Sequence, residues 1–155
     1  MEWAWLAPAL SFAAFGMIVL FGRYLPAKGV FLALLAVAAA FAVFWFVLLD
    51  LLNRGNGTFA VTWFELGGTT VNWGMIIDPL MVVMLGLVSF LALLIQIYSV
   101  GYMRGQPRFG WYFAAHALFA GAMLALIMAD NLLLFYIAWE LVGLGSYLLI
   151  GFWYE

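Results

Sequence analysis

Long apolar stretches separated by short polar breaks form the main pattern of this chain. A helix needs about 20 apolar residues to cross the ~30 Å of hydrocarbon in a bilayer. Five stretches reach that length: Trp3–Leu25, Gly29–Leu52, Asp78–Met103, Phe109–Ala129 and Asn131–Trp153. Three of the breaks between them are about a turn long and contain Pro, Gly, Asp or Asn, which favour turns and helix ends. The pattern therefore predicts about five transmembrane helices.

The longer break, residues 53–77, has a different pattern. Two runs of β-prone residues lie on either side of Gly67-Gly68, and a two-residue Gly-Gly loop is typical of a β-hairpin. We expect one external β-hairpin between the second and third helices, lying against the helix ends or a neighbouring subunit, in place of an irregular loop. The expected register pairs Phe64 with Val71, and Thr62 with Trp73.

Composition supports a membrane protein. Hydrophobic residues make up 70% of the chain and charged residues 8%, with a mean hydropathy of +1.19. Soluble domains are about half apolar and about a quarter charged. A soluble fold of this length could not bury so much apolar surface. We therefore expect an all-α integral membrane protein, with residues 1–155 forming a single membrane domain.

The distribution of charge predicts the orientation. Four of the five basic residues lie in the breaks on one side of the predicted membrane: Arg23, Lys28, Arg104 and Arg108. Arg54 is the basic residue on the other side, together with five acidic residues. Because basic loops stay in the cytoplasm, the amino terminus is expected outside.

Glu140 is the acidic residue that lies deep in a predicted helix. It lies about 14 Å from one end and about 20 Å from the other. Removal from water favours the neutral acid, whereas a nearby cation favours the carboxylate. Tyr136, Gly143 and Tyr147 share its helix face, which suggests a buried site. Such a group can bind and release a proton, or it can be a structural residue bonded to a partner helix.

Gln96 and His116 are each ten residues from Gln106, the middle of the loop between the third and fourth helices. If those helices pack antiparallel, the two side chains lie at the same depth. They would line a proton path, because His titrates near neutral pH. Alternatively, they form a polar pair that holds the two helices together.

Other kinds of site lack the necessary residues. The chain has no cysteine, which excludes disulfides, thiolate metal sites and cysteine nucleophiles. We find no phosphate-binding glycine loop and no zinc-ligand spacing. Five scattered basic residues give no nucleic-acid footprint. We therefore expect no metal, no cofactor and no nucleic acid on this chain.

Two motifs resemble a known family. Ile97–Gly105 is similar to the end of the third helix of the antiporter-like subunit L of proton-pumping NADH-quinone oxidoreductase, respiratory complex I. Ala129–Tyr154, which includes Ala-Trp-Glu-Leu-Val-Gly-Leu-Gly-Ser-Tyr, resembles the fourth-to-fifth helix signature of that subunit. The outer hairpin that leads into Asp78-Pro79-Leu80 also fits. The similarity covers roughly residues 58–155, and the first two helices match only in layout.

This resemblance implies a role for Glu140. In the family, the matching Glu pairs with a lysine on a later helix and takes part in proton translocation, while the redox centres lie in other subunits. The chain is thus expected to relay protons coupled to quinone reduction without redox chemistry of its own. Its expected partners are other membrane subunits of a respiratory complex, a chain carrying the remaining helices, and the lipid of a bacterial-type cytoplasmic (inner) membrane.

The chain also departs from the family. Relatives run to about fourteen or more helices, so this sequence resembles an amino-terminal quarter, either a fragment or a split-gene product. Gln96 replaces a His found in many relatives, and Gly145 replaces a frequent Cys. Two other functions remain open: part of the large subunit of a multisubunit cation/proton antiporter, or a non-conducting structural or assembly piece.

Overall fold

The computed structural model describes residues 2–153. Its five α-helices are α1 (Leu6–Phe21), α2 (Val30–Arg54), α3 (Pro79–Tyr102), α4 (Phe109–Met128) and α5 (Leu132–Ile150). Two strands, β1 (Gly57–Leu66) and β2 (Thr69–Ile77), form the hairpin between α2 and α3. Short 3₁₀ segments are η1 (Glu2–Trp5), η2 (Pro26–Gly29) and η3 (Gly151–Trp153). Within the described range, five helical segments are long and apolar enough to cross a membrane, which confirms the predicted fold class.

Side chains cap two of the helices at the hairpin end of the molecule. The Asp78 carboxylate accepts a hydrogen bond from the Met81 backbone N–H at 2.7 Å, at the start of α3. The Asn131 side chain accepts one from the Leu134 N–H at 3.0 Å, at the start of α5. The first N–H groups of a helix have no intrahelical partner, and near hydrocarbon such a group is costly to leave unpaired. These two caps therefore fix where α3 and α5 begin.

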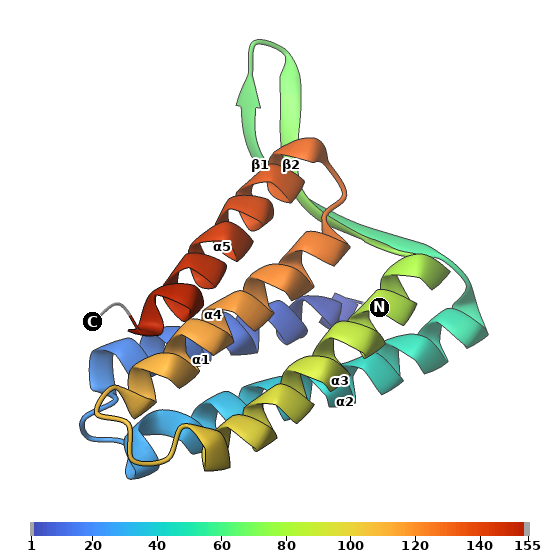
Figure 1. Ribbon diagram of the computed structural model, residues 1–155. Helices are drawn as coiled ribbons and strands as arrows, with labels where there is room; N and C mark the ends of the chain where they lie inside the picture. The colour runs from blue at the N-terminus through green and yellow to red at the C-terminus, as the bar shows by residue number, and fades with distance from the viewer. Residues whose placement is uncertain (1, 154–155) are drawn as a thin grey trace.

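Helix α4 lies at the centre of the bundle (Figure 1). It packs against α1, α2 and α3, which also pack on one another in chain order, and against α5 on another side. In the most apolar 18-residue stretch of α4, 61% of the residues are buried, whereas in the corresponding stretch of α5 the share is 17%. Most of the surface of α5 is thus free of contact with the other described helices.

Small residues allow these close contacts. A Cβ atom on Gly121 of α4 would lie 3.1 Å from Ser11 Cβ in α1. A Cβ on Gly145 of α5 would lie 3.0 Å from the Cα of Phe119 in α4. Real Cβ atoms rarely approach other atoms so closely, so a larger residue at either position would push two helix backbones apart. Small residues at helix contacts are typical of membrane bundles.

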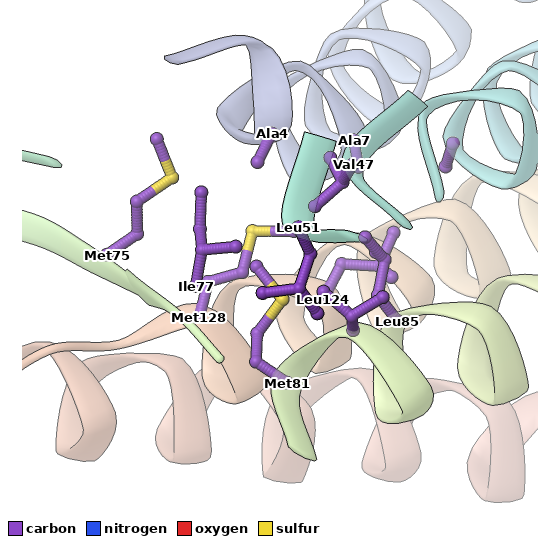
Figure 2. Packing of buried hydrophobic residues seen from close by; sticks show 12 residues of the cluster. Ala4, Ala7, Val47, Leu51, Met75, Ile77, Met81, Leu85, Leu124 and Met128 are labelled. Carbon is purple, nitrogen blue, oxygen red and sulfur yellow. The ribbon is translucent and has the colours of Figure 1, made fainter. Parts of the chain in front are cut away.

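The base of the hairpin covers one end of the bundle and packs on its core. Met75 and Ile77 of β2 are buried in one cluster with residues of η1, α1, α2, α3 and α4, and Figure 2 shows Ile77 among the side chains of this cluster with Met75 farther along β2. Met75 forms a β-bridge with Ala129, and Asn131 donates to the carbonyl of Asn72 at 2.9 Å. The hairpin tip extends beyond the start of α5 (Figure 1). The prediction that the hairpin lies against the helix ends is therefore confirmed for its base.

The predicted hairpin register is correct near the turn and wrong farther from it. Phe64 pairs with Val71 as expected, but Thr62 pairs with Asn72, not with Trp73. The cause is a bulge at Trp63, which adds one residue to β1 without a counterpart in β2. The bulge brings the Trp63 ring edge-on to the Trp73 ring, with 5.7 Å between their centroids. Counting residues from the turn assumes a regular ladder and misses such a shift.

The charge pattern predicts that the hairpin and the loop between α3 and α4 lie on opposite sides of the membrane. Because the chain has no native cysteine, single cysteines at Thr70 and Gln106 can be labelled without background. In intact cells, a membrane-impermeant maleimide should label the cysteine at position 70 only, and permeabilisation should expose position 106. Labelling of both from the same side would contradict the predicted topology.

Gly145→Leu is expected to destabilise the bundle by about 1–3 kcal/mol, because the added side chain overpacks the contact between α5 and α4. Gly143→Leu is the matched control, since an added Cβ there meets nothing within 4 Å. Thermal unfolding of the purified chain in detergent measures both. Equal melting temperatures for the two variants would show that α5 is not held through Gly145.

Candidate functional site

The site residues predicted from the sequence lie in two separate places. Glu140 and its neighbours occupy the outer face of α5. Gln96 and His116 lie between α3 and α4. The contacts of each place decide what chemistry it can support.

Glu140 lies on the side of α5 that points away from α4. The residues by which α5 packs on α4 include Ala138 and Gly145, and Gly145 is about 140° from Glu140 around the helix. Tyr136 and Tyr147 are 61% and 73% exposed, and an added Cβ on Gly143 would meet nothing within 4 Å. We call Tyr136, Glu140, Gly143 and Tyr147 the Glu140 face. The predicted clustering of these residues on one face is confirmed, but the face is exposed in this chain, whereas the sequence suggested a buried site.

Tyr136 is a polar partner of Glu140 in the chain. Its side chain, one turn earlier on α5, interacts electrostatically with the Glu140 carboxyl group. Arg54 and Asp50 form an ion pair at the hairpin end of the molecule. Among residues 2–153, no basic side chain pairs with Glu140. A carboxylate in hydrocarbon costs about 2.5–3.5 kcal/mol on insertion scales. The Glu140 face therefore needs protonation, water or a cationic partner to be stable in a membrane.

Gln96 and His116 form the contact predicted from their spacing. Gln96 Nε2 lies 3.1 Å from His116 Nδ1, and the two residues are 0% and 4% exposed. With Gln96 as the donor, the imidazole is neutral and its proton is on Nε2. The other amide atom, Gln96 Oε1, is buried without a hydrogen-bond partner among the described residues. The pair thus leaves one strong acceptor available at the contact between α3 and α4.

A second polar pair lies one turn nearer the loop between α3 and α4. The hydroxyl groups of Ser99 and Tyr112 are 2.9 Å apart, and either can donate. Together with Gln96 and His116 they form what we call the α3–α4 polar seam. The sequence analysis missed this pair, although Ser99 and Tyr112 are seven and six residues from Gln106, so the same spacing argument identifies them.

The seam and the Glu140 face are on different sides of α4. The seam lies where α4 meets α3, and Glu140 points away from α4 on the opposite neighbour, α5. Figure 1 shows α4 between α3 and α5. Within the described residues, no hydrogen bond joins the two places. The fold thus confirms the Gln96–His116 contact, while the role of either place in proton transfer stays a prediction.

Comparisons with known proteins match most of the chain. Residues 63–113 match the family model described as NADH-ubiquinone oxidoreductase (complex I), chain 5 N-terminus. Residues 129–155 match NADH:quinone oxidoreductase/Mrp antiporter, TM. The first match covers β2, α3 and three residues of the polar seam, Gln96, Ser99 and Tyr112. The second covers α5 with Glu140.

Similar curated proteins include three from different organisms. F(420)H(2) dehydrogenase subunit L of Methanosarcina mazei is 45% identical over 99% of this chain and 23% of the relative. NADH-quinone oxidoreductase subunit L of Mycobacterium tuberculosis is 42% identical over 99% of the chain and 25% of the relative. The subunit L of Escherichia coli is 39% identical over 77% of the chain and 20% of the relative. The chain thus spans about a quarter of the length of these relatives.

Replacing either member of the buried pair is expected to cost more than replacing both. Gln96→Leu leaves the His116 ring without its partner, and His116→Leu leaves the whole Gln96 amide unpaired, so each should destabilise the chain. The double variant removes both polar groups, and the coupling energy should be about 0.6–2 kcal/mol. Unfolding of the four proteins in detergent gives this double-mutant cycle. Additive effects would mean that the pair contributes no interaction of its own.

Proposed function

Because this chain belongs to the family of subunit L and chain 5 of NADH-quinone oxidoreductases, we propose that it is part of the proton-translocating membrane arm of such an enzyme. In this proposal the chain moves protons through the membrane, coupled to quinone reduction. The electron-transfer chemistry takes place on other subunits.

One observation supports the proposal: Glu140 is the carboxyl group in the middle of α5, a helix long enough to cross a membrane, and it lies on a face that no other described helix covers. A structural Glu would be expected to bond to the helix beside it, but Glu140 points away from α4, and its polar neighbour is Tyr136 of its own helix. A carboxyl group in lipid is favoured in its neutral form, and one beside a cation is favoured in its charged form. Approach and withdrawal of a cation can therefore make Glu140 release and bind a proton.

The required cation has to come from outside the described residues. All five basic side chains lie at helix ends or in loops. The family resemblance implies a lysine on a later helix, and the exposed Glu140 face offers a place for that helix. Gly143 supports this arrangement, because its missing side chain allows another helix or a water molecule to approach Glu140 closely.

The α3–α4 polar seam has two possible roles. As an access path, it would conduct protons from the loop between α3 and α4 toward His116, with the free acceptor Gln96 Oε1 holding a water. As a structural contact, it would hold α3 to α4. The position of α4 between the seam and Glu140 favours the structural role within this chain, since protons would need a further link to reach α5.

The names of the related proteins favour a subunit of a respiratory enzyme over a subunit of a cation/proton antiporter. The second family model describes both kinds of membrane protein, but the relatives above are named as subunits of an F(420)H(2) dehydrogenase or of quinone oxidoreductases. Their names differ in the electron donor while this membrane region is shared. The donor is therefore set by other subunits, and other membrane subunits are the expected partners.

Glu140→Gln tests the proposal, because it keeps the side-chain shape and removes the titrating proton. In the assembled enzyme, assembly should be retained and proton pumping per electron transferred should fall sharply, by tenfold or more on the scale of ~1.4 kcal/mol per factor of ten. Proton uptake by membrane vesicles, started with the electron donor, measures the effect. Glu65→Gln, an exposed change on the hairpin, is the matched control and should pump normally.

Two results would contradict this proposal. Normal pumping by a fully assembled Glu140→Gln enzyme would make Glu140 a structural residue and favour a scaffold role for the chain. Sodium-driven proton movement without any electron donor, abolished by the same change, would favour the antiporter. Blue native gels of the same membranes check assembly in either case.

A further inference from the structure

A basic cavity lies at the end of the bundle opposite the hairpin base. It has a volume of about 430 Å³ and opens between the end of α1, the η2 turn and the start of α4. Arg23, Lys28 and Arg108 line it, together with Trp111. The apolar part of its wall includes Ile18 and Ala114. Three cations from three separate segments of the chain thus converge on one space.

The η2 turn that carries Lys28 is held in an unusual conformation. Ala27, Lys28 and Gly29 have φ values of 50°, 55° and 87°, so three successive residues are left-handed. Two of them are not glycine, and such residues persist in this region only where the surroundings impose it. A Cβ on Gly110 of α4 would lie 2.8 Å from the Lys28 carbonyl oxygen, so α4 and the turn are in close contact. This close contact therefore holds the backbone of Lys28 at the wall of the cavity.

The three cations of this cavity differ in their partners, because the Arg108 guanidinium donates a hydrogen bond to the Phe152 carbonyl oxygen at 2.6 Å and lies over the Phe152 ring. Among the described residues, neither Arg23 nor Lys28 forms an ion pair, and the pair that is formed lies at the other end of the molecule. The Arg23 guanidinium lies over the Tyr24 ring, 4.5 Å from its centroid. Helix α4 begins at the cavity, and its N-cap residue Arg108 makes no side-chain cap, so the positive end of the helix dipole adds to the field. The cavity is thus complementary to an anion.

We propose that this cavity binds the phosphate headgroup of an anionic phospholipid. Its position selects a lipid, because it lies where two membrane-spanning helices begin or end and its inner wall is apolar. The phosphate would contact Arg23 and Lys28, while an acyl chain would follow the apolar residues toward the bilayer. Basic pockets between helices on the cytoplasmic side of membrane proteins are typical sites for such headgroups.

Native mass spectrometry of the complete chain, released from mixed bilayers of phosphatidylglycerol and phosphatidylcholine, tests the proposal. Wild-type protein should retain phosphatidylglycerol selectively. Lys28→Gln and Arg23→Gln should each lower its retention about fivefold, from ~1 kcal/mol per cation near an anionic lipid and ~1.4 kcal/mol per tenfold. Arg104→Gln is the matched control, because Arg104 is a cation at the same end but is not part of the cavity wall, and it should leave retention unchanged.

Three outcomes would overturn the proposal. Equal loss in Arg104→Gln would mean that lipid is attracted by the general charge of this end of the molecule. Equal retention of the two lipids by wild-type protein would mean that no headgroup site exists. Displacement of phosphatidylglycerol by an equal concentration of inorganic phosphate would make the cavity a site for free anions. Cysteine labelling at positions 70 and 106 verifies that each variant is inserted like the wild-type chain.

Discussion

Close packing of helix backbones against α4 is the interaction on which the rest of this fold depends. In a bilayer, lipid tails are as apolar as leucine, so helices gain little by hiding apolar side chains from their surroundings. Association then rests on van der Waals contact and a few hydrogen bonds, and both require short distances between backbones. Gly121 provides the approach of α1, and Gly145 provides that of α5. Because Gly145 sets which side of α5 meets α4, it also sets the outward direction of Glu140.

The hairpin has a different structural role. It pairs backbone groups at the end of the bundle where α3 and α5 begin. Backbone groups there must be paired, because unpaired groups are costly next to hydrocarbon. The β-ladder pairs its own backbone, the Met75–Ala129 bridge extends that pairing to the start of α5, and Asn131 both caps α5 and bonds to Asn72. One residue thus joins helix α5 to strand β2. Its connection to the hairpin gives α5 a second attachment besides its packing on α4.

The sequence allowed prediction of features that depend on local pattern. The spans follow from the length of apolar runs, the hairpin from Gly67-Gly68, and the Gln96–His116 contact from equal spacing about a short loop. The bulge at Trp63 was not predictable, because the β-prone runs on either side of Gly67-Gly68 carry no signal for an extra residue in one strand. The exposure of Glu140 was not predictable either. A polar face on a membrane helix can meet another helix or remain outside the bundle, so the residues that share a face with Glu140 do not indicate which side of α5 meets α4; the small residue at position 145 decides it.

An outward-facing carboxyl group links protonation to assembly. Tyr136 is the polar neighbour of Glu140 on this face, and no cation among the described residues pairs with Glu140, whereas a carboxylate without water or a counter-ion is costly in lipid. In the proposed function, a helix that brought a cation to the Glu140 face would favour the carboxylate, so that contact and proton release would occur together. The contact is also favoured by the open space at Gly143. If that cation then moved away, Glu140 would take up a proton again. The need of the carboxylate for a cationic partner would in this way drive a proton-transfer step. The low burial of α5 is what leaves this face available to such a partner.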